Sequence, residues 1–472
     1  MDAPRPGNRL RLLTLDVTGT PDGPPRTVPV VLDHRRPAPV DTVVHAGLLW
    51  DGTGSAPRAD VDVLIRDGRI TAVEPHRPGR RAARGVDASR ATVLPGLWDS
   101  HVHPYPYTYG ARQGLLHLAY GVTTTVSLCG SAHEQARLRA DIRAGLLRAP
   151  RLLAGGELLD GSRVAYSMGR AHRTRAGFAR SLARAEALDW DFVKTYVRAP
   201  YELMAEAARF AHERLGVLAG SHLCAPGIQS GQDLTTHLVA TERAEHGHGA
   251  TPRGHTYQDT VEVYARGGFD LIATPFTALP LIGADTALAA DPRVTALMPP
   301  WDVAAVREAA GRPPSADQYD VLEREVAAYR DVLAGGGRVI LGTDAPLTPV
   351  GLHLHLGLRA LHRYGLSPAE ALTTVTLAPA RTFGVADRLG TVEVGRIGDV
   401  TVIDGDPFAD FDDLVRVRAV VCGGTVHDRA EPAASPTARR AAGPAAPPED
   451  GWRAMLDRMR RDGCCPSHEP SP

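Results

Sequence analysis

Residues 94–104 read Leu94-Pro95-Gly96-Leu97-Trp98-Asp99-Ser100-His101-Val102-His103-Pro104, an apolar run that ends in two histidines two positions apart. Side chains at i and i+2 of a β-strand project to the same face. His101 and His103 can therefore offer two imidazoles to one metal ion, while Val102 points the other way. The plain alternative is a pair of polar residues at a strand end. We favour the metal-binding interpretation because two unpaired imidazoles on a buried strand would be costly.

This stretch resembles the first barrel strand of the amidohydrolase superfamily, written PGxxDxHxH. The resemblance implies an α/β fold, a (β/α)8 TIM barrel with a small β-sandwich formed from segments before and after the barrel. It also implies a metal-dependent hydrolase site at the C-terminal mouth of the barrel. Two further segments resemble the family's sandwich. The first runs from Thr42 to Val73 and contains an Asp67-Gly68 hairpin turn, and the second runs from Leu389 to Ile403.

From Val93 onward the sequence alternates between strand-like and helix-like segments, and eight such units over about 290 residues suit a TIM barrel. Helices are expected between most of the strands, as at 132–147, 201–214 and 319–334, and another opens at Ser367-Pro368 and runs through Arg381. Residues Phe276 to Pro314 are expected to form a long, Pro-rich connection that could act as a substrate lid. The candidate strands are Val93–His103, Val122–Leu128, Arg151–Gly155, Asp191–Tyr196, Gly216–His222, Arg243–His246, Asp270–Pro275 and Arg338–Asp344.

These patterns divide the chain into four parts. Residues 1–40 are a Pro- and Arg-rich extension that is partly β, with strand-like runs at 10–17 and 27–32 that could add edge strands to a small sheet. Residues 41–92 and 385–428 are expected to form the β-sandwich, and residues 93–384 the catalytic barrel. Residues 429–472 are rich in Ala, Pro and Arg and are expected to be a disordered tail, with a short helix near 452–461.

The composition restricts the class of protein. A hydrophobic content of 43%, a charged content of 23% and a net charge of -1 suit a soluble enzyme and give no reason to expect nucleic acid or a membrane as partner. The five cysteines have no framework spacing, which is typical of a reduced compartment. No secretory signal or membrane-spanning run is evident. We therefore expect a cytoplasmic protein, and the sequence leaves open whether it forms a homo-oligomer.

Lysine occurs once in the chain, at Lys194, among 53 lysine and arginine residues. Such a bias indicates that surface lysines are readily replaced by arginine. A lysine that persists is then expected to do what arginine cannot, because a guanidinium stays protonated and is not an amine nucleophile. Survival by chance is the alternative. Lys194 lies near the end of the expected fourth barrel strand, which favours the chemical explanation.

The resemblance implies a ligand at the end of each of several strands. Individually the matches are weak, since each residue has an ordinary structural explanation, but five signals in the right order favour a metal centre. The implied cofactor is Zn2+, with two ions bridged by a carboxylated lysine. A metal-activated hydroxide would attack the substrate carbonyl, and Asp344 would carry the proton to the leaving nitrogen. The expected ligands are His101, His103, Lys194, His222, His246 in Glu245-His246-Gly247, and Asp344 in Gly342-Thr343-Asp344.

Several residues are expected to contact the substrate. Tyr196 lies two residues beyond Lys194, faces the same interior and resembles a tyrosine that donates a hydrogen bond to the substrate carbonyl. Packing in the barrel is the equal alternative. The loop after the third strand, residues 161–173, could bind a substrate carboxylate together with Arg198. A solvated loop is the alternative. The candidate substrate-binding residues are Arg163, Tyr166, Arg170, Arg198 and His248.

These features favour a metal-dependent hydrolase of an amide bond in a peptide or small amide substrate, resembling the prolidase and imidazolonepropionase-like branch. An enzyme of this kind in a chain with such an arginine bias further resembles peptide-tailoring enzymes. One example is the class of bottromycin-type amidohydrolases, which remove a follower peptide in natural-product biosynthesis. The alternatives are an Xaa-Pro-type dipeptidase, a cyclic-amide hydrolase and a deaminase. Lys194 argues against the deaminase. A metal-free binding protein on the same scaffold is a further alternative, but every ligand position is filled.

Overall fold

The computed structural model of the protein describes residues 41–80, 82–104, 109–164, 169–238 and 253–428. It also gives the backbone of a separate antiparallel pair, β1 (Leu13–Val17) and β2 (Arg26–Val30). These two strands pair with each other in a sheet of their own rather than extending a larger sheet. The residues expected to form the C-terminal tail lie outside the described part of the chain.

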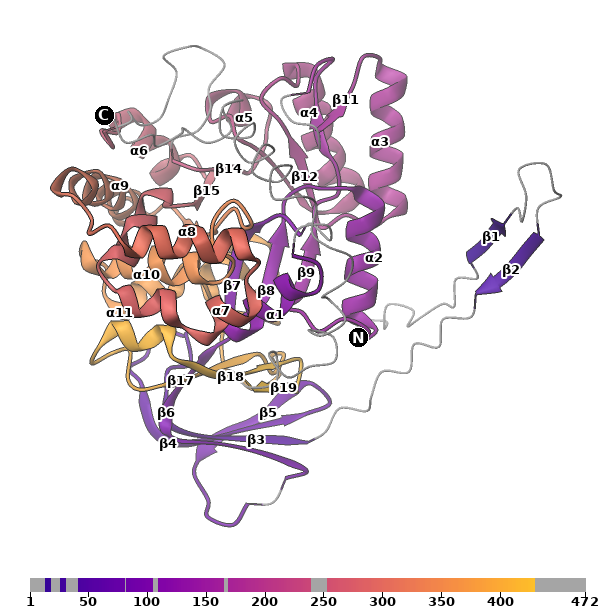
Figure 1. Ribbon diagram of the computed structural model, residues 1–472. Helices are drawn as coiled ribbons and strands as arrows, with labels where there is room; N and C mark the ends of the chain where they lie inside the picture. The colour runs from indigo at the N-terminus through magenta and orange to yellow at the C-terminus, as the bar shows by residue number, and fades with distance from the viewer. Residues whose placement is uncertain are drawn as a thin grey trace.

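Parallel strands form the barrel that carries the candidate site (Figure 1). One sheet has the order β7-β8-β9 and the other β11-β10-β12-β13-β14-β15-β16. Their bounds are β7 (Leu97–Val102), β8 (Val122–Ser127), β9 (Arg151–Ala154), β10 (Leu158–Asp160), β11 (Gly169–Ala171), β12 (Phe192–Thr195), β13 (Leu218–Ser221), β14 (Leu234–Thr236), β15 (Asp270–Ala273) and β16 (Val339–Leu341).

Two junctions close the ring. The first is a parallel bridge between Val102, at the end of β7, and Ala345, just after β16. At the second, β9 and β10 are two pieces of one barrel strand that are separated at Gly156. Gly156 has a φ of 68°, and a Cβ there would lie 1.9 Å from the Trp190 ring, so only glycine fits. Leaving aside β11, which pairs only with β10, these strands make eight positions, as expected for a TIM barrel.

Helices surround the strands, as in other barrels of this class (Figure 1). Serine caps fix two of the helix starts, at Ser315 before α9 and at Ser367 before α11, and each forms a capping box. The helices and helical turns are α1 (Arg112–Ala119), α2 (Ala132–Arg143), α3 (Arg175–Ala187), α4 (Tyr201–Phe210), η1 (Ala211–Leu215), α5 (Ala225–Gln229), α6 (Gln258–Arg266), α9 (Ala316–Ala334), α10 (Leu352–Arg363), α11 (Pro368–Thr373), α12 (Leu377–Thr382) and η4 (Phe411–Val415).

A second, largely antiparallel sheet lies below the barrel in Figure 1 and joins segments from both sides of it in the chain. Its order is β19-β18-β17-β6-β3-β4-β5, and its inner side chains, such as Val44, Val63 and Val402, form a separate apolar core. The sheet therefore has the two-part origin expected for the sandwich. Its strands are β3 (Thr42–Leu49), β4 (Arg58–Arg66), β5 (Arg69–Pro75), β6 (Arg84–Pro95), β17 (Val400–Asp404), β18 (Val417–Cys422) and β19 (Thr425–Asp428).

The expected hairpin is confirmed, since β4 and β5 pair across Asp67 and Gly68, both with positive φ. Each expected barrel strand contains an observed strand, except Arg243–His246, which lies outside the described residues. The expected strand Val93–His103 is two strands, because the chain leaves the small sheet after β6 and enters the barrel as β7. The helix expected from Ser367 to Arg381 is likewise two, α11 and α12.

The long, Pro-rich connection expected over 276–314 does lead from β15 to α9, and the structure shows that it is largely helical. This segment contains η2 (Phe276–Gly283), η3 (Thr286–Ala290), α7 (Pro292–Leu297) and α8 (Pro300–Ala310). Apolar side chains such as Ile282, Val294 and Val306 are fully buried in the main core. Pro292 and Pro300 stand in the first turns of α7 and α8, where no backbone N–H is needed, whereas Pro280 lies inside η2.

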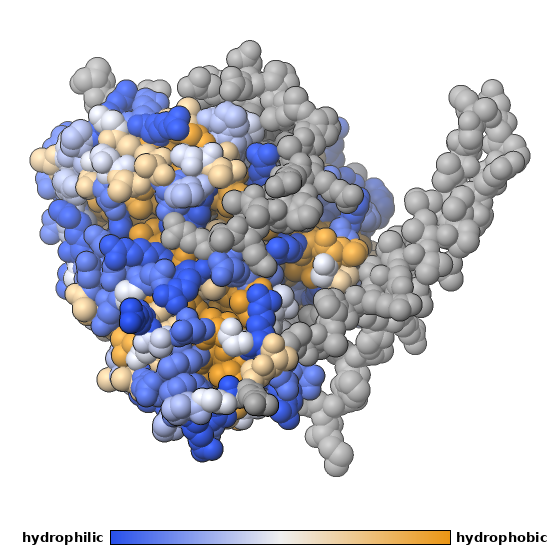
Figure 2. Space-filling view, turned by 60° about the horizontal axis from the view of Figure 1, so that its bottom comes forward, coloured by the Kyte–Doolittle hydropathy of each residue, from blue (hydrophilic) through white to orange (hydrophobic). Residues whose placement is uncertain are grey.

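Within the described part of the chain, no helix combines the length and the apolar character needed to cross a membrane. Figure 2 shows that hydrophilic side chains cover most of the face it presents, with apolar areas between them. The large hydrophobic residues exposed elsewhere, such as Leu146 and Val394, are scattered along the sequence. Isolated apolar residues of this kind are normal on a protein surface.

Candidate metal centre

Six side chains with metal-ligand chemistry lie at the carboxyl ends of five barrel strands, where active sites of this fold are built. All six are buried, with at most 8% of any residue exposed. They come from strands far apart in sequence, so only the barrel brings them together. They are His101 from β7, His103 directly after β7, Lys194 from β12, His222 directly after β13, His237 directly after β14, and Asp344 three residues after β16.

The two histidines at the end of β7 meet Asp344. The Nε2 atoms of His101 and His103 are 3.2 Å apart, and Asp344 Oδ1 lies 3.4 Å from the first and 3.0 Å from the second. On its other side, the ring of His103 bonds through Nδ1 to the carbonyl oxygen of Cys129, at 3.1 Å. A bond of this kind orients a ligating imidazole from behind and leaves the other nitrogen for the metal.

A close approach between β7 and the end of β16 puts Asp344 in this position. The backbone N–H of Asp344 donates to the carbonyl of His101 at 2.8 Å. A Cβ on Gly342 would lie 2.6 Å from the Cβ of His101, so a larger residue would push the two segments apart. Asp344 itself has a φ of 58°, in the left-handed region. Such strained backbone concentrates at functional sites.

His222 and His237 face the first pair across the barrel mouth. Their ring centroids are 4.9 Å apart, and the ring of His237 lies 5.1 Å from that of His101. His237 Nε2 is 3.8 Å from Asp344 Oδ2. Neither ring nitrogen of His237 has a hydrogen-bond partner among the described residues, and its φ is 70°. A buried, strained and unbonded histidine is costly unless something binds it.

Lys194 is completely buried and donates from Nζ to Thr236 Oγ1 at 2.9 Å. The same hydroxyl is 2.9 Å from Nδ1 of His222, so one threonine links the lysine to a histidine of the site. Burial lowers the pKa of Lys194 to about 7. A large share of the amine is therefore neutral near pH 7, which is the form that reacts with carbon dioxide.

Burial also sets the charge of the neighbouring groups. It lowers the pKa of His101 and His222 well below the usual range and that of His237 to about 4. These imidazoles are consequently neutral at pH 7 and can offer lone pairs to a cation.

Asp99 supports the site from behind β7. It is buried and accepts hydrogen bonds from the backbone N–H and the hydroxyl of Thr343, at 3.0 and 2.6 Å. Its Oδ1 also lies 3.4 Å from the backbone nitrogen of His101. Burial raises the pKa of Asp99 to about 7. This side chain thus ties the strand that carries His101 to the segment that carries Asp344.

The structure brings together five of the six residues that the sequence suggested as ligands, and it adds His237. The sixth, His246, lies outside the described residues, as do His248 and Tyr166. A sequence signal for His237 exists: Leu234-Thr235-Thr236-His237 is a short β-type run that ends in histidine. Three strand residues make a weak pattern, and the Glu-His-Gly text nine residues later matched the family better.

The residues expected to bind substrate lie in two places. Tyr196 is buried beside the candidate ligands, with its ring 4.7 Å from that of His222. Arg163, Arg170 and Arg198 are exposed, and Arg198 bonds to the carbonyl of Val164 at 2.7 Å. This contact holds the guanidinium of Arg198 against the loop after the third barrel strand.

The donor set fits divalent cations. One ligand atom from each of His101, His103 and Asp344 lies within 4.8 Å of the other two. Nδ1 of His101 and both ring nitrogens of His237 are buried without a hydrogen-bond partner among the described residues. Imidazole and carboxylate ligands without thiolate suit zinc and related ions. The site can therefore polarise a carbonyl and activate water when loaded.

Comparisons with known proteins agree with this geometry. The amidohydrolase family model matches residues 92–426. An imidazolonepropionase from Solibacter usitatus (strain Ellin6076) is 27% identical over 408 residues, which cover 78% of this chain and 91% of the relative. A dihydroorotase from Pelotomaculum thermopropionicum (strain DSM 13744 / JCM 10971 / SI) is 28% identical over 375 residues, covering 73% and 84%.

Among solved structures, a crystal structure of a Xaa-Pro dipeptidase with methionine bound in its active site is similar, with a TM-score of 0.62. The sequence identity is 18%, and the match covers 82% of this chain and 100% of that one. At this identity the likeness shows the barrel fold alone. The family match, by contrast, spans more than half of the chain. The protein belongs to the amidohydrolase family and is a hydrolase of carbon–nitrogen bonds.

Proposed function

We propose that the protein hydrolyses an amide bond in a peptide-like substrate at a divalent metal centre in the barrel mouth. The observation that carries the proposal is the convergence of six buried ligand side chains at the ends of five barrel strands. In the proposed ligand set, His101, His103 and Asp344 hold one ion, and His222 and His237 hold the other. Lys194, once carboxylated on Nζ, would complete the ligand set.

Zinc ions bound there would supply a nucleophilic hydroxide at neutral pH and polarise the substrate carbonyl. The chain's part in carboxylation is to keep the Lys194 amine partly neutral by burial, because only a neutral amine reacts with carbon dioxide. Thr236 fixes the amine by accepting its hydrogen bond. An arginine at this position could not be carboxylated, which agrees with the survival of one lysine in an arginine-rich chain.

Asp344 is proposed to accept the proton from the attacking water and to return it to the departing nitrogen. It is held in place by the backbone of His101 and by the network that joins Thr343 to Asp99. Tyr196 is proposed to donate its phenolic hydrogen to the oxygen that gains charge during attack. Its position against His222 puts the phenol ring beside the ligands.

A peptide-like substrate is supported by the exposed arginines beside the strand-three loop. Arg198 is tied to this loop, and Arg163 and Arg170 belong to it. Guanidinium groups bind carboxylates through paired hydrogen bonds, so these arginines suit the free carboxylate of a peptide. The narrower proposal, removal of a follower peptide in bottromycin-type biosynthesis, rests on the sequence resemblance.

A second candidate is hydrolysis of a cyclic amide. It is favoured by the relative named imidazolonepropionase, which aligns over 91% of its own length. The same metal-assisted chemistry opens a ring when the amide is internal to the substrate. The two candidates differ in what the arginines must bind and in the size of the substrate.

The test is a substrate panel read by mass spectrometry: Xaa-Pro dipeptides, longer C-terminally free or amidated peptides, an azoline-containing peptide and small cyclic amides. Cleavage of a peptide with a free carboxylate, weakened by Arg198→Gln, supports the proposal. Arg66→Gln, at an exposed arginine of the small sheet, is the matched control. Cleavage of an internal amide in a modified peptide supports the follower-peptide form. Turnover confined to cyclic amides would reject a peptide substrate.

A further inference from the structure

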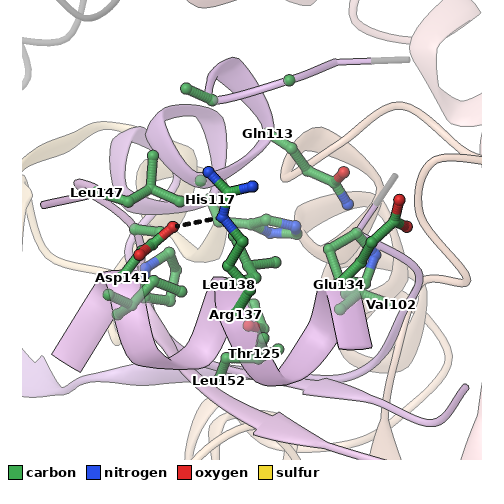
Figure 3. Close-up of a pocket in the computed structure, with 17 residues that line it drawn as sticks. Val102, Gln113, His117, Thr125, Glu134, Arg137, Leu138, Asp141, Leu147 and Leu152 are labelled. Carbon is green, nitrogen blue, oxygen red and sulfur yellow. Dashed lines mark ion pairs between the residues drawn. The ribbon is translucent and has the colours of Figure 1, made fainter. Parts of the chain in front are cut away.

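A cavity of about 340 Å³ lies between α1 and α2, against the outer side of the first three barrel strands (Figure 3). Its walls are mostly apolar and include Val102, Leu138, Ile142 and Leu152. Figure 3 shows Arg137 and Asp141 of α2 together at one side, where they form an ion pair of 3.6 Å. Cavities of this size accept a small organic molecule, and apolar cavities smaller than this bind benzene.

Two buried polar side chains line this cavity without full hydrogen bonding. His117 is 2% exposed, and neither of its ring nitrogens has a hydrogen-bond partner among the described residues. Gln113 is 4% exposed and donates from Nε2 to the carbonyl of His103 at 3.2 Å, while its Oε1 is unbonded within the same part of the chain. Unmet polar groups of this kind cost free energy, so they favour a ligand that can bond to them.

The two groups offer complementary hydrogen bonding. Burial lowers the pKa of His117 to about 3, so the neutral ring carries one N–H donor and one acceptor nitrogen. Gln113 Oε1 is an acceptor. A primary amide matches this pair, because its carbonyl accepts from His117 and its NH2 group donates to Gln113. A charged group would fit poorly between these two side chains, because both are neutral and offer it no opposite charge.

The cavity and the candidate metal centre lie on opposite faces of β7. Val102 lines the cavity, whereas the neighbouring His101 and His103 face the barrel mouth. Asp99 contacts the backbone of His101, and its Oδ2 lies 3.9 Å from Nδ1 of His117. The cavity is therefore a place distinct from the metal centre, yet it contacts the strand that carries two of the candidate ligands.

We propose that this cavity is a second binding site, which takes a small uncharged amide with an aryl or branched aliphatic group. The apolar group packs against Leu138, Ile142 and Leu152, and the amide bonds to His117 and Gln113. The site is separate from the proposed active site, and its occupation does not depend on metal.

Ligand-observed NMR with benzamide and metal-free protein tests this site. The expected dissociation constant is about millimolar, as for other ligands of this size. Leu138→Trp extends a half-buried side chain of α2 into the cavity and should weaken binding at least tenfold. Ala140→Trp, at an exposed position of the same helix, should bind benzamide as the natural chain does. Equal binding in both variants places benzamide elsewhere, including the barrel mouth, and overturns the proposal.

The polar end is tested by His117→Leu and by toluene, which has no amide. Loss of the ring nitrogens should weaken benzamide binding between about two- and tenfold, the contribution of one ordinary hydrogen bond, and leave toluene binding unchanged. Circular dichroism melting shows whether the variant is folded. Unchanged benzamide binding in folded His117→Leu, or no binding of benzamide to the natural chain up to its solubility, contradicts the assignment.

Discussion

Two groups of histidine and aspartate side chains in this protein have almost the same composition but different surroundings. The barrel group is His101, His103 and Asp344, and the small-sheet group is His45, Asp62 and His76. In both, one ligand atom from each residue lies within 4.8 Å of the others. Composition and spacing alone therefore do not tell a metal centre from a structural cluster.

The small-sheet group is internally satisfied. Asp62 accepts from His76 at 2.8 Å, from the backbone of Arg77 at 3.2 Å and from Arg80 at 2.9 Å. Burial acts to raise the pKa of Asp62, but the bonds from His76 and Arg77 hold it below its ordinary value. His45 bonds to an exposed aspartate, and its ring stacks on that of His76 at 3.5 Å. These groups have their partners already.

The barrel group is different, because some buried ring nitrogens in it and beside it have no hydrogen-bond partner among the described residues. Both ring nitrogens of the adjacent His237 and one of His101 lack a bond among the described residues, and the backbone is strained at two positions. Burial raises the pKa of Asp99 behind the site to about 7, the opposite of what happens to Asp62. The difference teaches that unmet bonding under burial, rather than residue type, marks the functional cluster.

The largest expected effect is on catalysis at the barrel group. Asp344→Asn keeps the shape of the side chain but cannot carry a proton, so kcat should fall by about 10²- to 10⁴-fold. Steady-state kinetics with the best substrate of the panel measures this, and elemental analysis shows whether metal is kept. A metal-loaded Asp344→Asn enzyme with undiminished kcat contradicts the proton-transfer role.

A smaller loss is expected for Tyr196→Phe, which removes only the phenolic hydroxyl. If this hydroxyl donates to the charged oxygen in the transition state, kcat should fall about 10²-fold with little change in KM. If Tyr196 is only packing, kcat should stay the same while the melting temperature changes. Kinetics and melting curves on the same preparation separate the two roles.

A third effect concerns acid stability. Burial lowers the pKa of His355 to about 3, while its Nε2 bonds to the carbonyl of Tyr120 at 2.8 Å. Below its ordinary pKa of 6.5 the unfolded chain takes up a proton that the folded chain refuses, so stability falls as pH falls from 6.5 toward 3. His355→Gln keeps a donor and cannot titrate. As the pH falls, the free energy of unfolding of this variant should fall less steeply than that of the natural chain, by about 1.4 kcal/mol per pH unit.

Urea unfolding at several pH values, with chelator present, measures this slope. His133→Gln, at an exposed position of α2, is the control and should leave the slope of the natural chain unchanged. A slope for His355→Gln equal to that of the natural chain would show that His355 is not held neutral by burial.

The smallest effect is expected at the small-sheet group. His76→Asn removes one of several partners of Asp62, so the unfolding free energy should fall by about 1 kcal/mol. Activity and metal content should not change, because this group is satisfied without an ion. Loss of a whole metal equivalent in this variant would show that the comparison between the two groups is mistaken.

Much of this arrangement could be predicted from sequence. The His-x-His spacing in β7, the single lysine and the Gly342-Thr343-Asp344 text each indicated a strand end with ligand chemistry, and these residues do lie together. His237 was missed, because a three-residue strand carries almost no periodicity. The prediction for 276–314 was a Pro-rich connection and named no helix there, whereas in the structure Pro292 and Pro300 occupy the first turns of α7 and α8.

The outer cavity could not be predicted from sequence either. His117 lies within a helix whose apolar pattern gives no sign that its ring is buried without a bond. This cavity depends on how α1 and α2 pack on the barrel strands. That packing is set by the shapes of side chains from several elements. Strand-end motifs are local in sequence, whereas cavities are not.

The central claim is that the barrel mouth binds two divalent ions, one at the barrel group and one at His222 and His237, with carboxylated Lys194 completing the ligand set. Elemental analysis of chelator-free protein, beside Lys194→Arg and His76→Asn, tests it most directly. The account predicts about two equivalents of metal in the natural chain and in His76→Asn, and loss of most metal in folded Lys194→Arg. Bicarbonate should speed metal uptake by the stripped natural chain and have no effect on Lys194→Arg. One equivalent or none in the natural chain, or full metal content in Lys194→Arg, would contradict it.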